Sequence, residues 1–178
     1  TVKPDVAMSV SDLEHTLLRM FPSDTAESWD LNGLRVGNPS DEVRGIAIAL
    51  DPTVDAIEDA HTAGANVLLT HHPVFLDAPT KIVPESATGA MAPQTCVWQA
   101  IRDGVSLMNF HTSLDVSHNA AEILPELLHL VYQGTVLPID DRGLGYGQLC
   151  TLRDMDRPMN VGQLAARCVS VFQRQPRV

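Results

Sequence analysis

Aromatic residues make up only 4% of this 178-residue chain, so its core must be built mainly from Val, Leu, Ile, Ala and Met. The three cysteines, Cys96, Cys150 and Cys168, form no paired motif, which argues against a disulfide framework or a zinc ribbon and favours a reducing cytoplasm. No apolar run approaches the roughly 18 residues that a membrane span needs. The N-terminal segment has no charged stretch followed by an apolar one, so we do not expect a signal peptide.

Positive charge is also scarce, with 12 Lys and Arg residues against 22 Asp and Glu, for a net charge of −10. Nucleic-acid binding depends on clustered Lys and Arg, so a nucleic acid is not expected as the main partner. The chain also lacks the GxxxxGK[ST] loop of nucleoside triphosphatases and the G-x-S-x-G nucleophile elbow. An acidic chain can still hold an anionic ligand if a bound metal reverses the local charge.

Apolar strands alternate with helices through the middle of the chain. Strands that are apolar throughout and separated by helices indicate βαβ units in a parallel sheet. We therefore predict an α/β fold, a mostly parallel sheet flanked by helices on both faces, in a single domain over residues 1–178. The predicted helices cover residues 9–21, 53–64, 94–104, 120–130 and 160–173, and the predicted strands cover 43–50, 65–70, 105–110, 134–139 and 142–152.

The segment between the first predicted helix and the first predicted strand, residues 22–42, is rich in Gly, Pro, Asn and Asp. This composition predicts an irregular surface connection. Loops of such length are uncommon in compact domains unless they have a function, so a functional role is expected here. The helix before it has two candidate N-caps, Ser9 and Ser11.

Polar side chains follow three of the predicted strands at the points where they end. Asp51 follows the first of them, His71 and His72 the second, and His111 the third. Because the carboxyl ends of parallel strands meet at one edge of the sheet, where ligands bind, we expect these residues to share one rim. For Asp51 an alternative remains open, since a carboxylate just before a helix also serves as an N-cap.

His111 and Asp115 lie four residues apart, which puts both on one face of a helical turn. Together with His71 and His72 they form a nitrogen and oxygen ligand set that suits Zn, Mn or Fe. A site of this kind with open positions supports hydrolytic chemistry. The alternative for each histidine is an ordinary loop residue with no ligand role.

Several motifs of the chain resemble the NIF3-like family, whose members are often labelled GTP cyclohydrolase 1 type 2 homologues. The T-H-H-P motif followed by H-T-x-L-D is the most specific part of this resemblance. The similar segments are "ESWDLNGLRVGNP" (27–39), "IAIALDPTVDAI" (46–57), "GANVLLTHHPVF" (64–75), "GVSLMNFHTSLD" (104–115) and "GLGYGQL" (143–149).

The resemblance implies a site for two divalent metal ions in a protein that assembles as a toroidal hexamer. His71 and His72 would each contact one ion, and Asp115 would bind one of them. His111 matches a histidine of the site that is either a ligand or lies beside one, and it is the candidate catalytic residue. The remaining candidates contact the substrate or support the ligands; they are Asp30, Asn32 and Asp51.

The family usually supplies a further histidine and glutamate, four residues apart, from a segment near its C-terminus. Residues 150–178 contain no such pair. We therefore expect residues 1–178 to represent the N-terminal portion of the family fold. Three functions are carried forward: a two-metal hydrolase acting on a nucleotide as GTP cyclohydrolases do, with release of formate; a non-catalytic metal-binding or regulatory scaffold; and a metal-dependent phosphoesterase.

Overall fold

A computed structural model describes residues 7–84, 91–153 and 158–177 of the chain. The chain divides into two compact units, Thr1–Leu114 and Asp115–Val178. The predicted single domain over residues 1–178 stays a prediction. Among the described residues, no helix has both the length and the apolar character that crossing a membrane requires.

The first unit is built on a four-stranded sheet with the order β1-β4-β3-β2. The strands predicted over residues 43–50, 65–70 and 105–110 are present as β2, β3 and β4. They run parallel, which confirms the mostly parallel α/β fold. A fourth strand, β1, pairs antiparallel with β4 and lies within the segment that was predicted to be irregular. The strands are β1 (Gly33–Val36), β2 (Ile46–Ala49), β3 (Val67–Thr70) and β4 (Ser106–Asn109).

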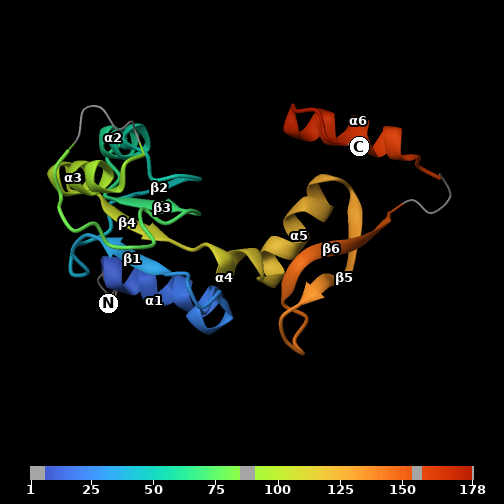
Figure 1. Cartoon of the computed structure of the whole chain (residues 1–178), viewed down its shortest axis with the longest axis horizontal. Coiled ribbons are helices and arrows are strands. Elements are labelled where there is room, and N and C mark those ends of the chain that lie inside the picture. Colours follow the sequence, from blue (N-terminus) through green and yellow to red (C-terminus); the bar gives the residue numbers. More distant parts are fainter. Residues whose placement is uncertain (1–6, 85–90, 154–157, 178) are drawn as a thin grey trace, which may run out of the picture. The chain divides into compact units, whose positions relative to one another are not determined.

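Helices cover both faces of this sheet (Figure 1). Helix α1 (Val10–Met20) packs on one face, and α2 (Val54–Thr62) and α3 (Pro93–Asp103) pack on the other. Because strand side chains alternate between faces, Val67 of β3 joins the core under α1 while Leu68 joins the core under α2 and α3. Both residues are almost completely buried, as expected for a strand in the middle of the sheet.

The edge strand β2 is apolar throughout its sequence, but only one of its faces packs against a core. Its Ile48 is 80% exposed and its Ile46 is 44% exposed, whereas Ala47 and Ala49 pack against the core under α2 and α3. The buried cluster beneath α1 is built from residues of α1, β3 and β4 and the residue after β4, so it stops short of this edge. The sequence pattern alone could not distinguish an edge strand from a central one.

Capping residues fix where the helices begin. Ser9, one of the two predicted caps, accepts a hydrogen bond from the backbone N–H of Asp12, whose carboxylate in turn accepts one from the backbone N–H of Ser9. This reciprocal arrangement is a capping box. Helix α2 is capped by Thr53, which accepts from the backbone N–H of Ala56, so the interpretation of Asp51 as the cap is wrong.

The second unit contains a two-stranded antiparallel sheet and helices. Strand β5 (Leu130–Pro138) pairs with β6 (Gly145–Leu152) along almost its whole length. Strand β5 begins four residues earlier than predicted, because pairing with β6 extends it across a register shift between Tyr132 and Gly134. Helix α5 (His118–Leu127) lies two to three residues before the predicted range 120–130 and contains Pro125, and α6 (Val161–Phe172) is close to its predicted range.

Candidate metal centre

The register of the sheet brings the predicted site residues to one rim. Ala49 is paired with Thr70, and Thr70 with Asn109, so the three parallel strands end at the same level. The chain continues from these three positions to Asp51, to His71 and His72, and to His111. This register brings the residues after the three strands to one edge of the sheet, as the sequence predicted.

Backbone hydrogen bonds hold the two adjacent histidines in place after β3 ends. The backbone N–H groups of His71 and His72 donate to the carbonyls of Ala49 and Leu50, at 3.3 and 3.0 Å. The hydroxyl of Thr70 donates to the carbonyl of His72 at 2.8 Å. The parallel pairing therefore extends two residues past β3, and both imidazoles start from a fixed backbone.

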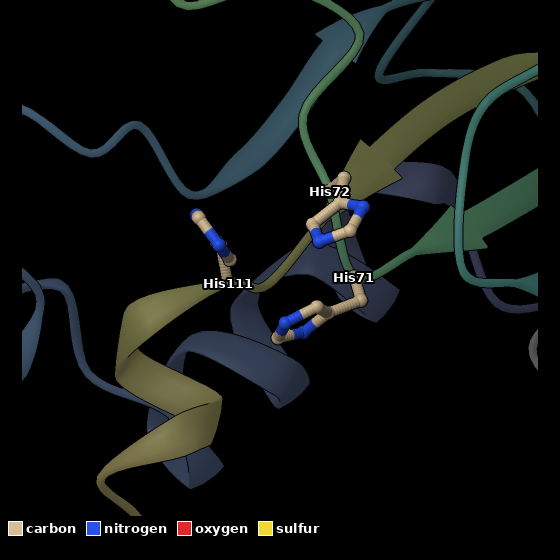
Figure 2. A group of neighbouring side chains, drawn as sticks. All are labelled: His71, His72 and His111. Atoms are coloured by element: carbon tan, nitrogen blue, oxygen red, sulfur yellow. The ribbon is translucent and has the colours of Figure 1, made fainter. Parts of the chain in front are cut away.

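The rings of His71, His72 and His111 converge from two segments of the chain (Figure 2). Ring centroids are 5.0 Å apart for His71 and His72, 4.9 Å for His71 and His111, and 5.5 Å for His72 and His111. Each histidine offers one nitrogen, and the three nitrogens lie within 4.8 Å of one another. Three half-buried imidazole nitrogens at this separation are able to hold one transition-metal ion.

Asp51 faces His72 across the rim. Its Oδ1 lies 2.7 Å from Nδ1 of His72, a short hydrogen bond between two partly exposed side chains. Asp51 belongs to the residues after β2 and His72 to those after β3, so adjacent parallel strands supply the two partners. The contact explains why Asp51 lies at this rim although it does not cap α2.

The segment before β1 forms a second wall of the site through Asp30. Oδ2 of Asp30 accepts two hydrogen bonds from Thr112, from its backbone N–H at 2.8 Å and its hydroxyl at 2.5 Å. Oδ1 accepts from the backbone N–H of Leu31. Burial raises the pKa of the Asp30 carboxyl, but the hydrogen bonds from Thr112 and the nearby His111 outweigh burial and hold this pKa below its usual value.

Asn32 connects the same segment to the start of α4 (Thr112–Asp115). Its Oδ1 accepts a hydrogen bond from the backbone N–H of His111 at 3.1 Å. The side-chain amide of Asn109 donates to the carbonyl of Leu31 at 2.9 Å. Asp30 and Asn32 therefore fix the backbone that presents His111, and a function within residues 22–42 stays a prediction.

Two residues of the site were not singled out from the sequence. Thr112 donates twice to Asp30 and accepts from the backbone N–H of Glu27. The Trp29 ring meets the His111 ring edge-on, with centroids 5.8 Å apart. Both residues lie next to predicted site residues, Thr112 after His111 and Trp29 before Asp30, and this adjacency is the signal by which they could have been found.

His111 keeps a nitrogen available for a ligand. Its Nδ1 is 3.5 Å from Oδ1 of Asp30, too far for a good hydrogen bond, and it has no hydrogen-bond partner among the described residues although it is buried. A buried imidazole nitrogen without a partner is costly unless something else binds it. This orphaned atom, the two neighbouring histidines and the donor chemistry together fit a divalent metal ion.

Asp115, the carboxylate that was predicted as a ligand, is the last residue of α4 and the first residue of the second compact unit. The metal-capable group formed by the described residues consists of His71, His72 and His111, all in the first unit. A role of Asp115 as a ligand stays a prediction.

Comparison with known proteins gives a consistent family. A family model described as Duf34/NIF3 (NGG1p interacting factor 3) matches residues 8–178. A GTP cyclohydrolase 1 type 2 homolog of Streptomyces coelicolor is 30% identical over 162 residues, which cover 89% of this chain and 54% of the relative. A protein with the same name in Staphylococcus aureus is 34% identical over 110 residues, or 62% of this chain and 28% of the relative.

Solved structures agree on the fold. A hypothetical protein of Staphylococcus aureus superposes with a TM-score of 0.76 at 22% identity, over 94% of this chain and 65% of that chain. Reduced HcgD from Methanocaldococcus jannaschii gives a TM-score of 0.60 at 29% identity, over 78% of this chain and 52% of that chain. The chain spans about half the length of the Streptomyces relative and less of the Staphylococcus one.

Proposed function

The chain belongs to the Duf34/NIF3 family, and we propose that it is a divalent-metal-binding protein whose ions serve a hydrolase. The observation that carries this proposal is the convergence of three imidazole nitrogens within 4.8 Å at the carboxyl rim of the sheet. His71, His72 and His111 are the proposed ligands, and Asp115 completes a two-metal site. Zn, Mn and Fe all suit this mixture of nitrogen and oxygen donors.

The residues around the ions have separable tasks in this proposal. When bound, the metal supplies Lewis acidity at the substrate. His111 has one of two tasks in this proposal: its Nδ1 binds the ion as a third ligand, or His111 stays off the ion and moves a proton, and no strong hydrogen bond on Nδ1 prevents either. Asp30 and Asn32 hold the backbone on either side of His111, and the exposed ring of Trp29 beside it offers a flat surface for a heterocycle.

The proposed substrate is a nucleotide, in the manner of a GTP cyclohydrolase. In that reaction one water adds to C8 of the purine and opens its five-membered ring to a formamide, and a second water then hydrolyses the formamide and releases C8 as formate. Support comes from the names of the relatives, each of which is called a GTP cyclohydrolase 1 type 2 homolog. A phosphoesterase uses the same pair of ions on a phosphate ester, and a non-catalytic scaffold uses them only to bind metal; both are alternatives.

The proposal also covers the assembly. Family resemblance supports a homo-oligomer, with a hexamer as the expected size, and the exposed apolar side chains of β2 are compatible with a subunit contact. A cytoplasmic location is supported by the three cysteines, which form no disulfide within the described part of the chain. No membrane or nucleic-acid partner is proposed.

The enzyme hypotheses are tested by incubating metal-loaded protein with GTP and, separately, with a chromogenic phosphodiester. Formate release from GTP supports the cyclohydrolase, and chromophore release supports the phosphoesterase. The matched control is His72→Ala, which removes one proposed ligand and should abolish either turnover. Full metal occupancy with no turnover of either substrate would leave only the scaffold.

A further inference from the structure

We infer that Asp51 is a positioning residue that fixes the tautomer of His72, so that Nε2 of His72 is the nitrogen offered to the metal. The inference rests on the proposed metal site and adds the device that prepares one of its ligands. It gives Asp51, which does not cap α2, a role in the site.

The hydrogen bond itself dictates the tautomer. Nδ1 of His72 and Oδ1 of Asp51 are 2.7 Å apart, within the range of a strong charge-assisted hydrogen bond. An ionised carboxylate can only accept, so Nδ1 must carry the proton. In a neutral imidazole the other nitrogen then holds the lone pair, and only a lone pair can bind a metal ion. His72 is therefore fixed with Nε2 as its ligand atom.

Backbone hydrogen bonds and a proline hold the main chain at Asp51 and His72. The backbone of His72 is bonded to Leu50, the residue directly before Asp51, at 3.0 Å, and the Thr70 hydroxyl holds the carbonyl of His72. Pro52, buried just after Asp51, restricts the backbone on the other side. The carboxylate and the imidazole are thus held at bonding distance by neighbouring strands.

The second aspartate of the site does not play the same part. Asp30 also lies near a histidine nitrogen, Nδ1 of His111, but at 3.5 Å and with its oxygens already engaged by Thr112 and Leu31. His111 is consequently not fixed in one tautomer by a carboxylate. The structure therefore provides one histidine whose tautomer is fixed by a carboxylate, His72, and one whose tautomer is not, His111.

Carboxylates behind metal-binding histidines have a known effect on affinity. They orient the ring, fix the tautomer and raise the basicity of the ligand nitrogen, and removing one weakens metal binding by about 10- to 100-fold. The same loss is expected for Asp51→Ala. Asp55→Ala is the matched control, because Asp55 is an exposed aspartate four residues away, and its removal changes the net charge by the same amount.

The first measurement needs no variant. Long-range nitrogen–proton NMR correlations of the metal-free protein at pH 8 report the tautomer of each neutral histidine, and His72 is assigned by its absence in His72→Ala. We expect His72 of the unmodified chain to carry its proton on Nδ1. A proton on Nε2 of His72 would overturn the inference whatever the variants do.

The second measurement is the dissociation constant for Zn²⁺ alone, obtained by competition with a chromophoric chelator. Asp51→Ala should raise it about 10- to 100-fold and mix the His72 tautomers, while Asp55→Ala should stay within about twofold of the unmodified chain. Unchanged affinity and tautomer in Asp51→Ala would refute the positioning role. If the unmodified chain does not bind Zn²⁺, the proposed metal site fails instead, and the tautomer measurement still decides the role of Asp51.

Discussion

Asp30 is the most completely buried carboxylate of the site, and its hydrogen bonds make the stability of the protein depend on pH. Its pKa lies below the ordinary value of 3.8, because the bonds from Thr112 and the proximity of His111 outweigh the effect of burial. A carboxyl whose folded pKa is lowered contributes stability above its unfolded pKa. That contribution is lost as the pH falls from about 4 through the folded pKa.

Thr112→Val tests this network by removing the hydroxyl donor while keeping the shape of the side chain. The free energy of unfolding at pH 7 should fall by about 1.5–3 kcal/mol, the usual size for a hydrogen bond to a charged group. The dependence on acid should also weaken, because the folded pKa of Asp30 moves toward 3.8. Urea unfolding between pH 3 and pH 7 measures both effects.

Thr62→Val is the control for this experiment, because Thr62 is an exposed threonine at the end of α2. It should change neither the stability nor its pH dependence. If Thr112→Val behaves like Thr62→Val, the bonds between Thr112 and Asp30 do not contribute to stability as described.

For single residues, the sequence predicted which side chains lie at the rim but not which hydrogen-bond partners they have. His71, His72 and His111 could be placed at one rim because each follows a strand of the same parallel sheet. The partner of Asp51 could not be chosen, because capping by Asp51 and bonding to His72 both suit a carboxylate between a strand and a helix. The structure separates them, because Thr53 caps α2 and Asp51 is hydrogen-bonded to His72.

Strand β1 is the element that joins the site to the N-terminal helix. At its start, Gly33 has φ +92°, a conformation that side-chain-bearing residues rarely adopt, and it lies directly against the Glu14 carboxylate. The same carboxylate accepts a hydrogen bond from the backbone N–H of Leu34 at 2.8 Å. Asn32, which bonds His111, immediately precedes this anchor.

Gly33→Ala should therefore disturb β1 and the segment before it. The added methyl group would meet the Glu14 carboxylate, and the backbone strain at positive φ adds about 1–3 kcal/mol. Gly134→Ala in β5 is the comparison, because no atom lies within 4 Å of its added carbon and its φ is not positive. Urea unfolding should show a clear loss of stability only for Gly33→Ala, and equal stabilities would contradict the anchoring role of Glu14.

The elements that were predicted correctly are those with strong local signals. Helix α1 has its cap and its apolar spacing, and β3 and β4 are continuous apolar runs. Strand β1 was missed because "GLRV" is only four residues long and includes a glycine and an arginine. Its strand conformation depends on antiparallel pairing with β4, a contact between residues more than seventy positions apart.

Over the whole chain, the metal should act as a stabilising ligand. An ion that binds only the folded protein adds about 2.7 kcal/mol at a free concentration 100 times its dissociation constant. Zn²⁺ should therefore raise the melting temperature by several degrees, and EDTA should reverse the rise. Differential scanning calorimetry with and without EDTA measures this, and an unchanged melting temperature in saturating Zn²⁺ would contradict binding to the folded state.

The acidic character of the chain is consistent with a cation as its principal inorganic ligand. The net charge of −10 attracts divalent ions in general, so weak binding at scattered carboxylates must be separated from binding at the histidines. Substituting the histidines distinguishes the two kinds of binding, because Zn²⁺ binds imidazole nitrogen in preference to isolated surface carboxylates.

Metal content is the sharpest test of whether His71, His72 and His111 together bind a divalent metal ion. Protein loaded with Zn²⁺ and then desalted is measured by elemental analysis in three forms: unmodified, with all three residues changed to alanine, and with the exposed histidines His15, His61 and His118 changed to alanine. We predict at least one ion per chain in the unmodified and control proteins and almost none in the triple site variant. An equal metal content in all three would show that these three histidines do not hold the ion.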